Sequence, residues 1–375
     1  MIRVLTIFGT RPEAIKLAPV IKALEAHCDQ FDSTVCITSQ HRQMLEQVLR
    51  VFDIKPQYDL NIMRSGQSLT DVTTKVLRKV GEVLSVEKPD LVLVQGDTTT
   101  TFGASLAAFY QKIKVGHIEA GLRTFDKSQP FPEEVNRRLT SVLTTYHFAP
   151  TKRAKENLIR EGIKEEDIIV TGNTGIDALF MTLAKIGNYH LKNLWQGKDL
   201  ANIGDHRLIL ITAHRREHFG VIFEEICRAI LEIVRRNPDV MVIYPVHLNP
   251  NIKVPASTLL GCHDRIMLVR PLEYAPFVEL LGKAYLILTD SGGIQEEAPS
   301  LGKPVLVMRN VTERPEAIEA GTARLVGTKA ETIADEVQTL LDDPVEYEKM
   351  SKAANPFGDG KASERIIGHI LKTLV

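Results

Sequence analysis

Short apolar runs alternate with amphipathic segments along most of this chain, and no other feature constrains the fold as strongly. In the first half, the apolar runs predict strands at 4–8, 34–38, 90–95, 115–118 and 147–150. Between them, the periodicity predicts helices at 14–26, 44–52, 69–87, 101–111 and 134–146. A repeated order of strand, crossover helix and strand indicates a parallel sheet that is covered on both faces.

The same alternation restarts in the second half of the chain. A strand at 168–171 leads into a helix at 176–186, and the polar segment 188–205 is interpreted as a loop or an interdomain connection. Further strands are predicted at 208–212, 240–244, 266–269, 285–288 and 304–308, with an edge strand at 324–326. Further helices are predicted at 223–236, 276–282, 294–301, 330–341, 346–353 and 362–374. We therefore expect an α/β protein with two doubly wound halves that face a cleft.

Length and composition narrow the class of protein. The 375 residues favour two domains, and the net charge of −1 favours neither nucleic acid nor an anionic membrane as a partner. No apolar run approaches 18 residues, so we expect no membrane span. The four cysteines show neither a CxxC pair nor metal-ligand spacing, which is typical of reduced thiols in a cytoplasmic protein.

The stretch 286–309 reads as strand, turn, helix and strand. Its turn, 289–293, contains Ser291 as a possible helix N-cap, followed by Gly292 and Gly293. A glycine turn that leads into a helix N-terminus favours a phosphate or diphosphate there, because N–H groups and the helix dipole both point at the ligand. The alternative is an ordinary strand-turn-helix in which the two glycines serve only the turn. Glu296 and Glu297 follow, and we expect Glu297 to contact a ribose and Glu296 to lie on the helix surface.

Polar residues also follow the predicted strands of the first half. Arg11 and Lys16 bracket a helix start and could hold phosphate or sugar oxygens, or simply form a solvated first turn. Asp97 and Glu119 end adjacent strands, and Glu133 begins a later helix. Such carboxylates suit general acid/base catalysis. Three alternatives stay open: a metal site, although no Asp-x-Asp motif occurs; an N-cap role for Asp97; and a helix-dipole role for Glu133.

In the second half, the strand at 208–212 ends at His214, which precedes two arginines. This position favours a role in anion binding or proton transfer, although a lone histidine is more often structural.

The motifs together resemble those of the non-hydrolysing bacterial UDP-N-acetylglucosamine 2-epimerase family. The matching segments, in order along nearly the whole chain, are 8–16, 96–100, 116–124, 132–137, 214–217, 244–250, 289–297 and 312–316. The resemblance implies the glycosyltransferase-B arrangement of two Rossmann-like domains. The final helix would return to the first domain, so that residues 1–171 plus 355–375 form the N-terminal domain and residues 172–354 the C-terminal, UDP-binding domain.

The resemblance also implies roles for individual residues. The catalytic groups would be Asp97, Glu119, Glu133 and His214. Besides Asp97, Glu119 and His214, the substrate contacts would be Arg11, Lys16, Leu272, Phe277, Ser291, Gly292, Gly293, Glu297 and Arg314. Leu272 stands where some relatives have Gln, Phe131 where they have Trp, and Gly66 where relatives regulated by their substrate have Arg.

The activity that the resemblance implies is the reversible conversion of UDP-GlcNAc into UDP-ManNAc, which supplies ManNAc units for surface polysaccharide. It implies anti elimination of UDP through a 2-acetamidoglucal, no cofactor, no metal and a homodimer. Three alternatives are a UDP-sugar glycosyltransferase of the same fold, a hydrolysing epimerase that releases ManNAc and UDP, and a non-catalytic nucleotide-sugar sensor.

Overall fold

The chain forms two compact units. The computed structural model describes residues 1–39, 42–64, 66–186 and 205–374. The first unit comprises Met1–Met181 with Phe357–Val375, and the second comprises Thr182–Pro356. The boundary falls inside helix α7 (Thr174–Ile186), further along the chain than residue 171. The expected polar connection at 188–205 lies almost wholly outside the described residues.

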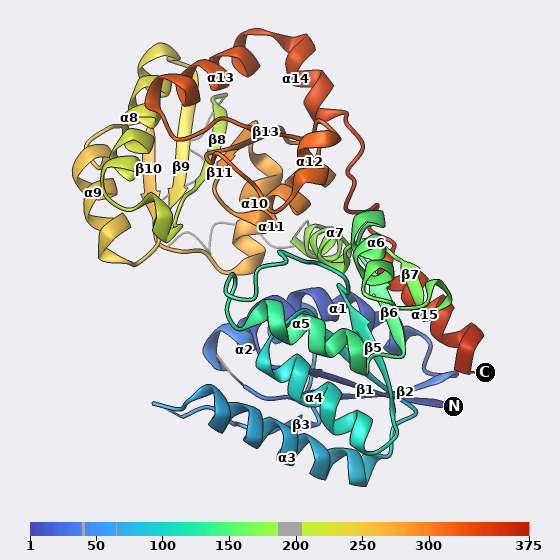
Figure 1. Cartoon of the computed structure of the whole chain (residues 1–375). Coiled ribbons are helices and arrows are strands. Elements are labelled where there is room, and N and C mark those ends of the chain that lie inside the picture. The colour runs from blue at the N-terminus through green and yellow to red at the C-terminus, as the bar shows by residue number, and fades with distance from the viewer. Residues whose placement is uncertain (40–41, 65, 187–204, 375) are drawn as a thin grey trace. The chain divides into compact units, whose positions relative to one another are not determined.

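The first unit is built on a seven-stranded parallel sheet with the strand order β3-β2-β1-β4-β5-β6-β7 (Figure 1). Its strands are β1 (Ile2–Phe8), β2 (Phe31–Ile37), β3 (Tyr58–Asp59), β4 (Leu91–Gln95), β5 (Lys114–Ile118), β6 (Tyr146–Ala149) and β7 (Ile168–Val170). Its helices, besides α7, are α1 (Arg11–Ala26), α2 (Arg42–Phe52), α3 (Leu69–Glu87), α4 (Thr99–Tyr110), α5 (Glu133–Leu143), α6 (Lys152–Arg160) and α15 (Ala362–Leu374). Helices α3, α4 and α5 pack side by side, and α1 packs against both α2 and α15.

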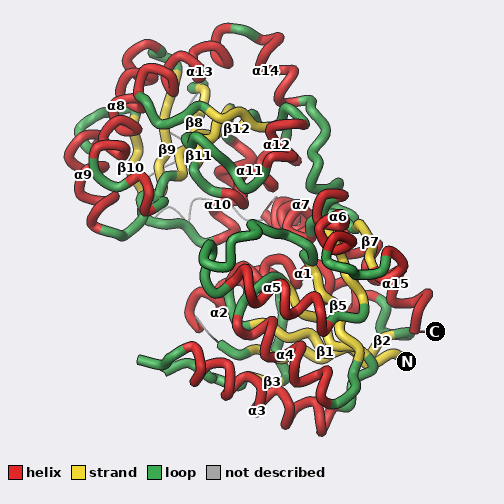
Figure 2. Tube along the Cα trace, viewed as in Figure 1, coloured by secondary structure: helices red, strands yellow, loops and turns green. Residues whose placement is uncertain are grey.

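The second unit repeats the design with a six-stranded parallel sheet in the order β10-β9-β8-β11-β12-β13. Its strands are β8 (Arg207–Thr212), β9 (Val240–Pro245), β10 (Ile266–Val269), β11 (Leu286–Thr289), β12 (Val305–Val307) and β13 (Ala323–Leu325). Its helices are α8 (Val221–Arg236), α9 (Pro250–Leu260), α10 (Tyr274–Lys283), α11 (Gly292–Glu297), α12 (Pro315–Glu319), α13 (Ala330–Asp342) and α14 (Pro344–Ser351). The alternation of helix and strand is visible throughout both units (Figure 2), and β13 lies at the sheet edge, as the sequence predicts.

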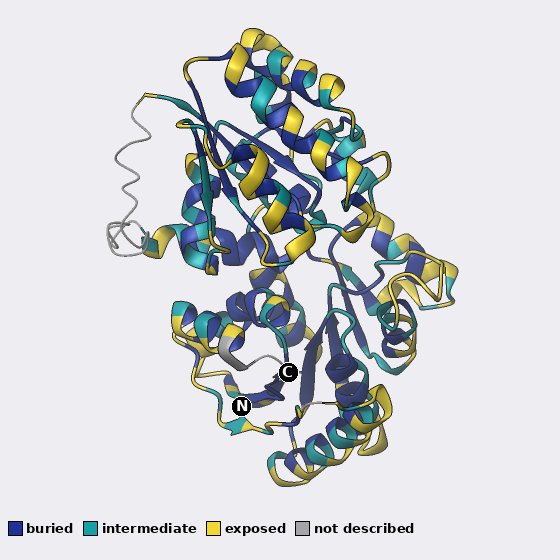
Figure 3. Cartoon of the chain, turned by 90° about the vertical axis from the view of Figure 1, so that its left-hand side faces the viewer, coloured by how far each residue is buried: buried dark blue, intermediate teal, exposed yellow. Residues whose placement is uncertain are grey.

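Each sheet is buried within its unit, and the longer helices are buried on one side and exposed on the other (Figure 3). Helix α3 shows the pattern: Val72, Val76, Val80 and Val83 recur at helical spacing and are all buried in one core cluster with the strands. The predicted bounds of α3 and α15, 69–87 and 362–374, are confirmed. Among the described residues, no helix is long and apolar enough to cross a membrane.

Helices α6, α9 and α12 are absent from the sequence prediction. Helix α9 contains Pro255 and begins at Pro250, so its sequence resembles a loop; proline at a first helical position is nevertheless favourable. The short α6 begins after Thr151, whose side chain accepts a hydrogen bond from the N–H of Ala154. These elements follow strands and complete the crossovers that parallel pairing requires.

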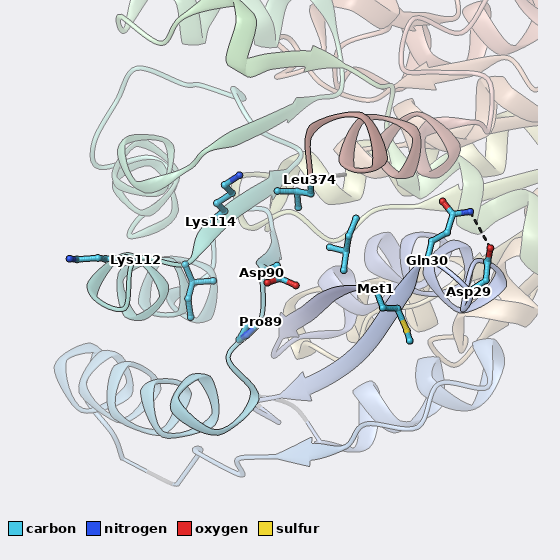
Figure 4. A pocket seen from close by; sticks show the side chains of 10 residues that line it. Met1, Asp29, Gln30, Pro89, Asp90, Lys112, Lys114 and Leu374 are labelled. Carbon is cyan, nitrogen blue, oxygen red and sulfur yellow. Dashed lines mark hydrogen bonds between the residues drawn. The ribbon is translucent and has the colours of Figure 1, made fainter.

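A surface pocket of about 760 Å³ opens at the amino ends of β1 and β5 (Figure 4). Its lining mixes the charged residues Asp29, Asp90, Lys112 and Lys114 with the apolar end of α15. Ligands of open parallel sheets bind outside the carboxyl ends of the strands. This pocket therefore lies at the edge of the first sheet opposite to the one where a reaction is expected.

Two arginines and one glutamate hold the loop that follows β12. The carboxylate of Glu313 accepts hydrogen bonds from Arg309 Nη1 at 2.6 Å and from Arg215 Nη1 at 2.9 Å. Burial raises the pKa of this carboxyl, but the hydrogen bonds from Arg309 and Arg215 outweigh burial and lower the pKa of Glu313 to about 2. The loop is thereby tied to Arg215, which follows β8 in the same sheet.

We predict that Glu313→Gln destabilises the protein at neutral pH and that the effect fades in acid. A carboxyl whose pKa is lower in the folded state stabilises the fold above its unfolded pKa, here 4.5, and this stabilisation is lost as pH falls toward 2. The urea midpoints of the variant and the parent should therefore differ by a constant amount above pH 5 and converge below pH 4.5. A difference that stays constant down to pH 3 would contradict the ion-pair account.

A second prediction compares two glycines that both have positive φ. Gly121, after β5, has a φ of +90°, and a Cβ there would overlap the carbonyl oxygen of Ala154; Gly162 has a φ of +88° and open space around it. The left-handed conformation costs a substituted residue about 1–2 kcal/mol, and overpacking adds about 1–3 kcal/mol. Gly121→Ala should therefore lower the free energy of unfolding by about 3 kcal/mol, and Gly162→Ala by about 1 kcal/mol. Equal losses in urea unfolding would show that the contact with Ala154 is unimportant.

Candidate active site

The carboxyl ends of β4 and β5 carry the two acidic residues that the sequence singles out. Gln95 pairs in register with Ile118, so Asp97 and Glu119 follow neighbouring strands at the same sheet edge. Between these strands, the ring of His117 contacts the carbonyl oxygen of Gly96, with Nε2 at 2.7 Å. Burial lowers the pKa of His117 to about 3, so the ring is neutral and its Nε2–H donates to Gly96. This histidine fixes the turn that leads to Asp97.

Glu119 is held by two side chains from different elements. Lys16 of α1 forms an ion pair with Oε1, and the amide of Gln95 donates to Oε2. The backbone of Glu119 has a φ of +66°, an uncommon conformation for a residue with a side chain. The ion pair shows that the fold brings together Lys16 and Glu119, which are 103 positions apart in the sequence.

Asp97 is held from α5. Arg137 forms an ion pair with its carboxylate, and the amide of Asn136 donates to its main-chain carbonyl at 3.0 Å. Asp97 and Glu119 thus each lie beside a different cation. Arg137 also lies 3.4 Å from the buried carboxylate of Glu134, so two carboxylates share its charge. The Asp97 side chain does not cap α4, because the hydroxyl of Thr98 does so by accepting from the N–H of Thr101. The N-cap interpretation of Asp97 is therefore wrong.

Glu133 is the first residue of α5, and its side chain makes no hydrogen bond or ion pair with any residue in the described part of the chain. Its neighbour Glu134 is fully buried and accepts from the N–H groups of Thr124 at 3.0 Å and Phe125 at 3.1 Å. Glu134 therefore anchors the irregular segment between β5 and α5, while Glu133 is half-buried.

Glu13, in the first turn of α1, connects the loop that follows β1 with the loop that follows β4. Its Oε2 accepts from the N–H groups of Gly9 at 3.1 Å and Thr10 at 2.8 Å, and its Oε1 accepts from the hydroxyl of Thr98 at 2.8 Å. Burial raises the pKa of Glu13 despite these hydrogen bonds. Because Arg11 follows one loop and Asp97 precedes Thr98 in the other, this single carboxylate fixes the relative positions of both backbones.

In the second unit, His214 follows β8 and lies next to the buried Asp290, which follows β11. The N–H of His214 donates to Asp290 Oδ2 at 2.7 Å, and the His214 ring stacks on His247 with centroids 5.9 Å apart. The side chain of His214 is 46% exposed, so a ligand can reach it.

The turn at 291–293 begins α11, two residues earlier than the sequence predicts. Ser291 occupies the N-cap position, but its hydroxyl makes no capping hydrogen bond. The helix is short and continues as a 3-10 turn at Ala298–Leu301. A Cβ at Gly292 would lie 3.8 Å from the guanidinium carbon of Arg314, so this arginine reaches the turn.

Glu296 does not lie on the helix surface, and that prediction is wrong. Its side chain is buried and forms an ion pair with Arg314, which comes from the loop before α12. An unpaired buried carboxylate would be costly, and the guanidinium supplies the compensating charge. Glu297 is half-buried. Leu272 precedes α10 and Phe277 lies within it; both are half-buried.

Several of these residues escape sequence reasoning. Gln95, Arg137 and Asp290 gain their roles only from strand pairing and helix packing, which bring distant segments together. The role of Glu13 could have been predicted from the sequence, because the spacing Thr-x-x-Glu is typical of a capping box, and Thr10 and Glu13 form one. No group of three His, Cys, Asp or Glu residues in the described ranges is arranged to hold a metal ion.

Comparison with known proteins identifies the family. Residues 22–371 match the family described as UDP-N-acetylglucosamine 2-epimerase. The chain is 56% identical over 367 residues to the UDP-N-acetylglucosamine 2-epimerase of Yersinia pestis, with 97% of each chain covered. It is 54% identical over 366 residues to that of Escherichia coli (strain K12), again with 97% of each covered.

Solved structures give the same result. The UDP-GlcNAc 2-epimerase of Neisseria meningitidis bound to UDP-GlcNAc is 53% identical, with a TM-score of 0.89 over 99% of this chain and 100% of that one. The enzyme of Methanocaldococcus jannaschii in complex with UDP-GlcNAc and UDP is 37% identical, with a TM-score of 0.79 over 99% and 100%. The sequence resemblance is thereby confirmed, together with the α/β fold of two parallel sheets. This chain belongs to the UDP-N-acetylglucosamine 2-epimerase family.

Proposed function

We propose that this protein interconverts UDP-GlcNAc and UDP-ManNAc by inverting C2 of the sugar, without net hydrolysis. Membership of the family supports the reaction class. The observation that carries the proposal is the placement of Asp97 and Glu119 at the ends of adjacent strands, each beside its own cation. Carboxylates that exchange protons with a sugar need fixed positions within reach of the reacting atoms.

The chemistry explains why UDP has to leave the sugar for a time. The C2 hydrogen is not next to a carbonyl, so direct removal of this proton is very unfavourable. When the bond from C1 to the diphosphate oxygen breaks, positive charge develops at C1 and acidifies C2–H. A base takes the proton, the C1–C2 double bond forms, and the products are 2-acetamidoglucal and UDP. UDP then adds back at C1 while a proton is delivered to the opposite face of C2.

We assign proton transfer to the set Asp97, Glu119, Glu133 and His214, without dividing the two sugar faces among them. Arg137 forms an ion pair with Asp97, and Lys16 forms one with Glu119. Loss of either cation would leave a poorly compensated carboxylate in the site.

We assign the UDP moiety to residues of the second unit, and we propose Arg11 and Lys16 as further anion contacts. The contacts proposed there are Leu272, Phe277, Ser291, Gly292, Gly293, Glu297 for the ribose, and Arg314. The approach of Arg314 to Gly292 supports this assignment, because a guanidinium beside exposed N–H groups suits a diphosphate. Such binding keeps UDP in place while the glucal exists, so that re-addition outruns release.

The proposed setting is a cytoplasmic homodimer that supplies ManNAc units for surface polysaccharide. The cysteines agree with a reducing compartment, since all four are free thiols. Burial raises the pKa of Cys36 and Cys227 to about 12, so these two thiols are unreactive.

The reaction itself is tested by incubating the protein with UDP-GlcNAc alone in D2O. We expect UDP-ManNAc to appear and deuterium to enter C2 of both recovered nucleotide sugars, as observed by NMR, because the proton exchanges with solvent while it resides on the enzyme. Turnover without label at C2 would exclude the elimination route. Unchanged UDP-GlcNAc would favour a glycosyltransferase or a sensor, and free ManNAc with UDP would favour a hydrolysing enzyme.

The role of the strand-end carboxylates is tested by Asp97→Asn and Glu119→Gln. We expect kcat to fall by about 100- to 10,000-fold in each variant, because the amide cannot exchange the proton. The dissociation constant of UDP should change by less than about threefold.

Asp90 provides the matched control for Asp97. It precedes β4, at the opposite end of the strand that Asp97 follows, and it is likewise paired with an arginine, Arg3. Asp90→Asn should leave kcat within about threefold of the parent. Equal losses in Asp90→Asn and Asp97→Asn would show that the effect on kcat comes from the fold rather than from the site.

A further inference from the structure

The second unit contains a buried carboxylate, Asp290, whose contacts single out one ring nitrogen of His214. Thr289 and Thr212 are partners in the β11–β8 pairing, so the residues that follow them, Asp290 and Ala213-His214, emerge side by side. Asp290 is fully buried, whereas the side chain of His214 is 46% exposed. The pair therefore consists of a buried carboxylate next to an imidazole ring that a ligand can reach.

One oxygen of Asp290 is committed to the backbone. Oδ2 accepts from the N–H of His214 at 2.7 Å and from the N–H of Arg215 at 2.8 Å. The Nδ1 atom of the buried His218 lies 3.2 Å from the same oxygen. These contacts fix the carboxylate plane, because a rotation of the group would break both backbone hydrogen bonds.

The other oxygen, Oδ1, faces the ring of His214. It has no hydrogen-bond partner of standard geometry among the described residues, and His214 Nδ1 lies 3.3 Å away. The ring cannot turn freely, because it is stacked on His247 with an interplanar angle of 19°. A small adjustment would complete a hydrogen bond from Nδ1–H to Oδ1.

The charge state of Asp290 decides which nitrogen carries the proton. Burial raises the pKa of this carboxyl, but His218, His214 and the N–H groups of Arg215 and His214 outweigh burial and hold the pKa below its usual value. An ionised carboxylate only accepts hydrogen bonds. The nitrogen that faces it must therefore bear the hydrogen.

We propose that Asp290 is a positioning residue that holds His214 in the Nδ1–H tautomer and leaves Nε2 unprotonated on the side of the ring away from the carboxylate. This inference rests on the proposed function, in which His214 exchanges a proton. When Nε2 takes up a proton from the reacting groups, the ring becomes a cation, and the charge of Asp290 balances it. When the proton is returned, the same tautomer is restored, so the cycle needs no further reactant.

The tautomer is tested directly by NMR on protein labelled with 15N-histidine. The signals of His214 are those missing from His214→Gln. In the parent protein, long-range 1H–15N correlations should show a protonated Nδ1 and an unprotonated Nε2. Because this measurement needs no change at Asp290, it decides the matter even if Asp290 variants fail to fold. A protonated Nε2 with a bare Nδ1 in the neutral ring would overturn the proposal.

The variant Asp290→Asn tests the cause of the tautomer. Its amide oxygen can replace Oδ2 and keep both backbone hydrogen bonds, while its NH2 group replaces Oδ1 and donates toward His214 Nδ1. The tautomer should therefore reverse to Nε2–H. If the variant keeps the parent's tautomer, Asp290 does not set it.

Kinetics then test whether the tautomer matters for the reaction. In Asp290→Asn, kcat should fall by about 100-fold or more, with KM changed by less than about threefold. Adding Asp290→Asn to His214→Gln should cause little further loss, because the two residues act as one unit. A reversed tautomer with undiminished kcat would overturn the positioning role.

Asp177 provides the control for a merely structural role. It is buried in the first unit and accepts from two consecutive N–H groups, those of Ala362 at 3.2 Å and Ser363 at 2.8 Å, much as Asp290 does. Asp177→Asn should leave both the His214 tautomer and kcat close to the parent's. If the proposed function is wrong, the parent protein will not epimerise UDP-GlcNAc. The NMR measurement of the His214 tautomer does not depend on that activity.

Discussion

Buried carboxylates that accept hydrogen bonds from loop N–H groups are the interaction on which the rest of this structure depends. Glu13, Glu134 and Asp290 are all buried, and each accepts from two consecutive N–H groups at or beyond a strand end. Parallel sheets collect such loops at one edge, but they do not fix the loop conformation. A charge-assisted hydrogen bond in the interior does, because breaking it would leave an anion unpaired. Asp97 and His214 thus project from loops whose backbones are fixed by a buried carboxylate.

The sequence predicts the two parallel sheets well, because strand and helix periodicities are local properties. It also predicts the strand-end position of Asp97, Glu119 and His214. It does not predict the partners of these residues, since Arg137 reaches Asp97 through the packing of α5, and Asp290 reaches His214 through the pairing of β11 with β8.

Glu296 shows that local patterns can also predict the wrong exposure for a side chain. Its place in a predicted helix suggested exposure, but Arg314, 18 positions later, turns it into half of a buried ion pair. Glu13 is the exception, because its capping box can be read from four consecutive residues. Contacts between residues close in the sequence can therefore be predicted from local patterns, whereas contacts that arise from tertiary packing cannot.

The proposed epimerisation places opposite demands on the protein: the C1–O bond has to break, and neither product may escape. Fixed acid/base groups lower the barrier for proton transfer, and strong anion binding retains UDP. The central claim is that enzyme-bound 2-acetamidoglucal and UDP are true intermediates. The most direct measurement is to supply the protein with 2-acetamidoglucal and UDP and to follow the anomeric NMR signals. The account predicts that both UDP-GlcNAc and UDP-ManNAc form. A protein that epimerises UDP-GlcNAc yet makes neither nucleotide sugar from these two compounds would contradict it.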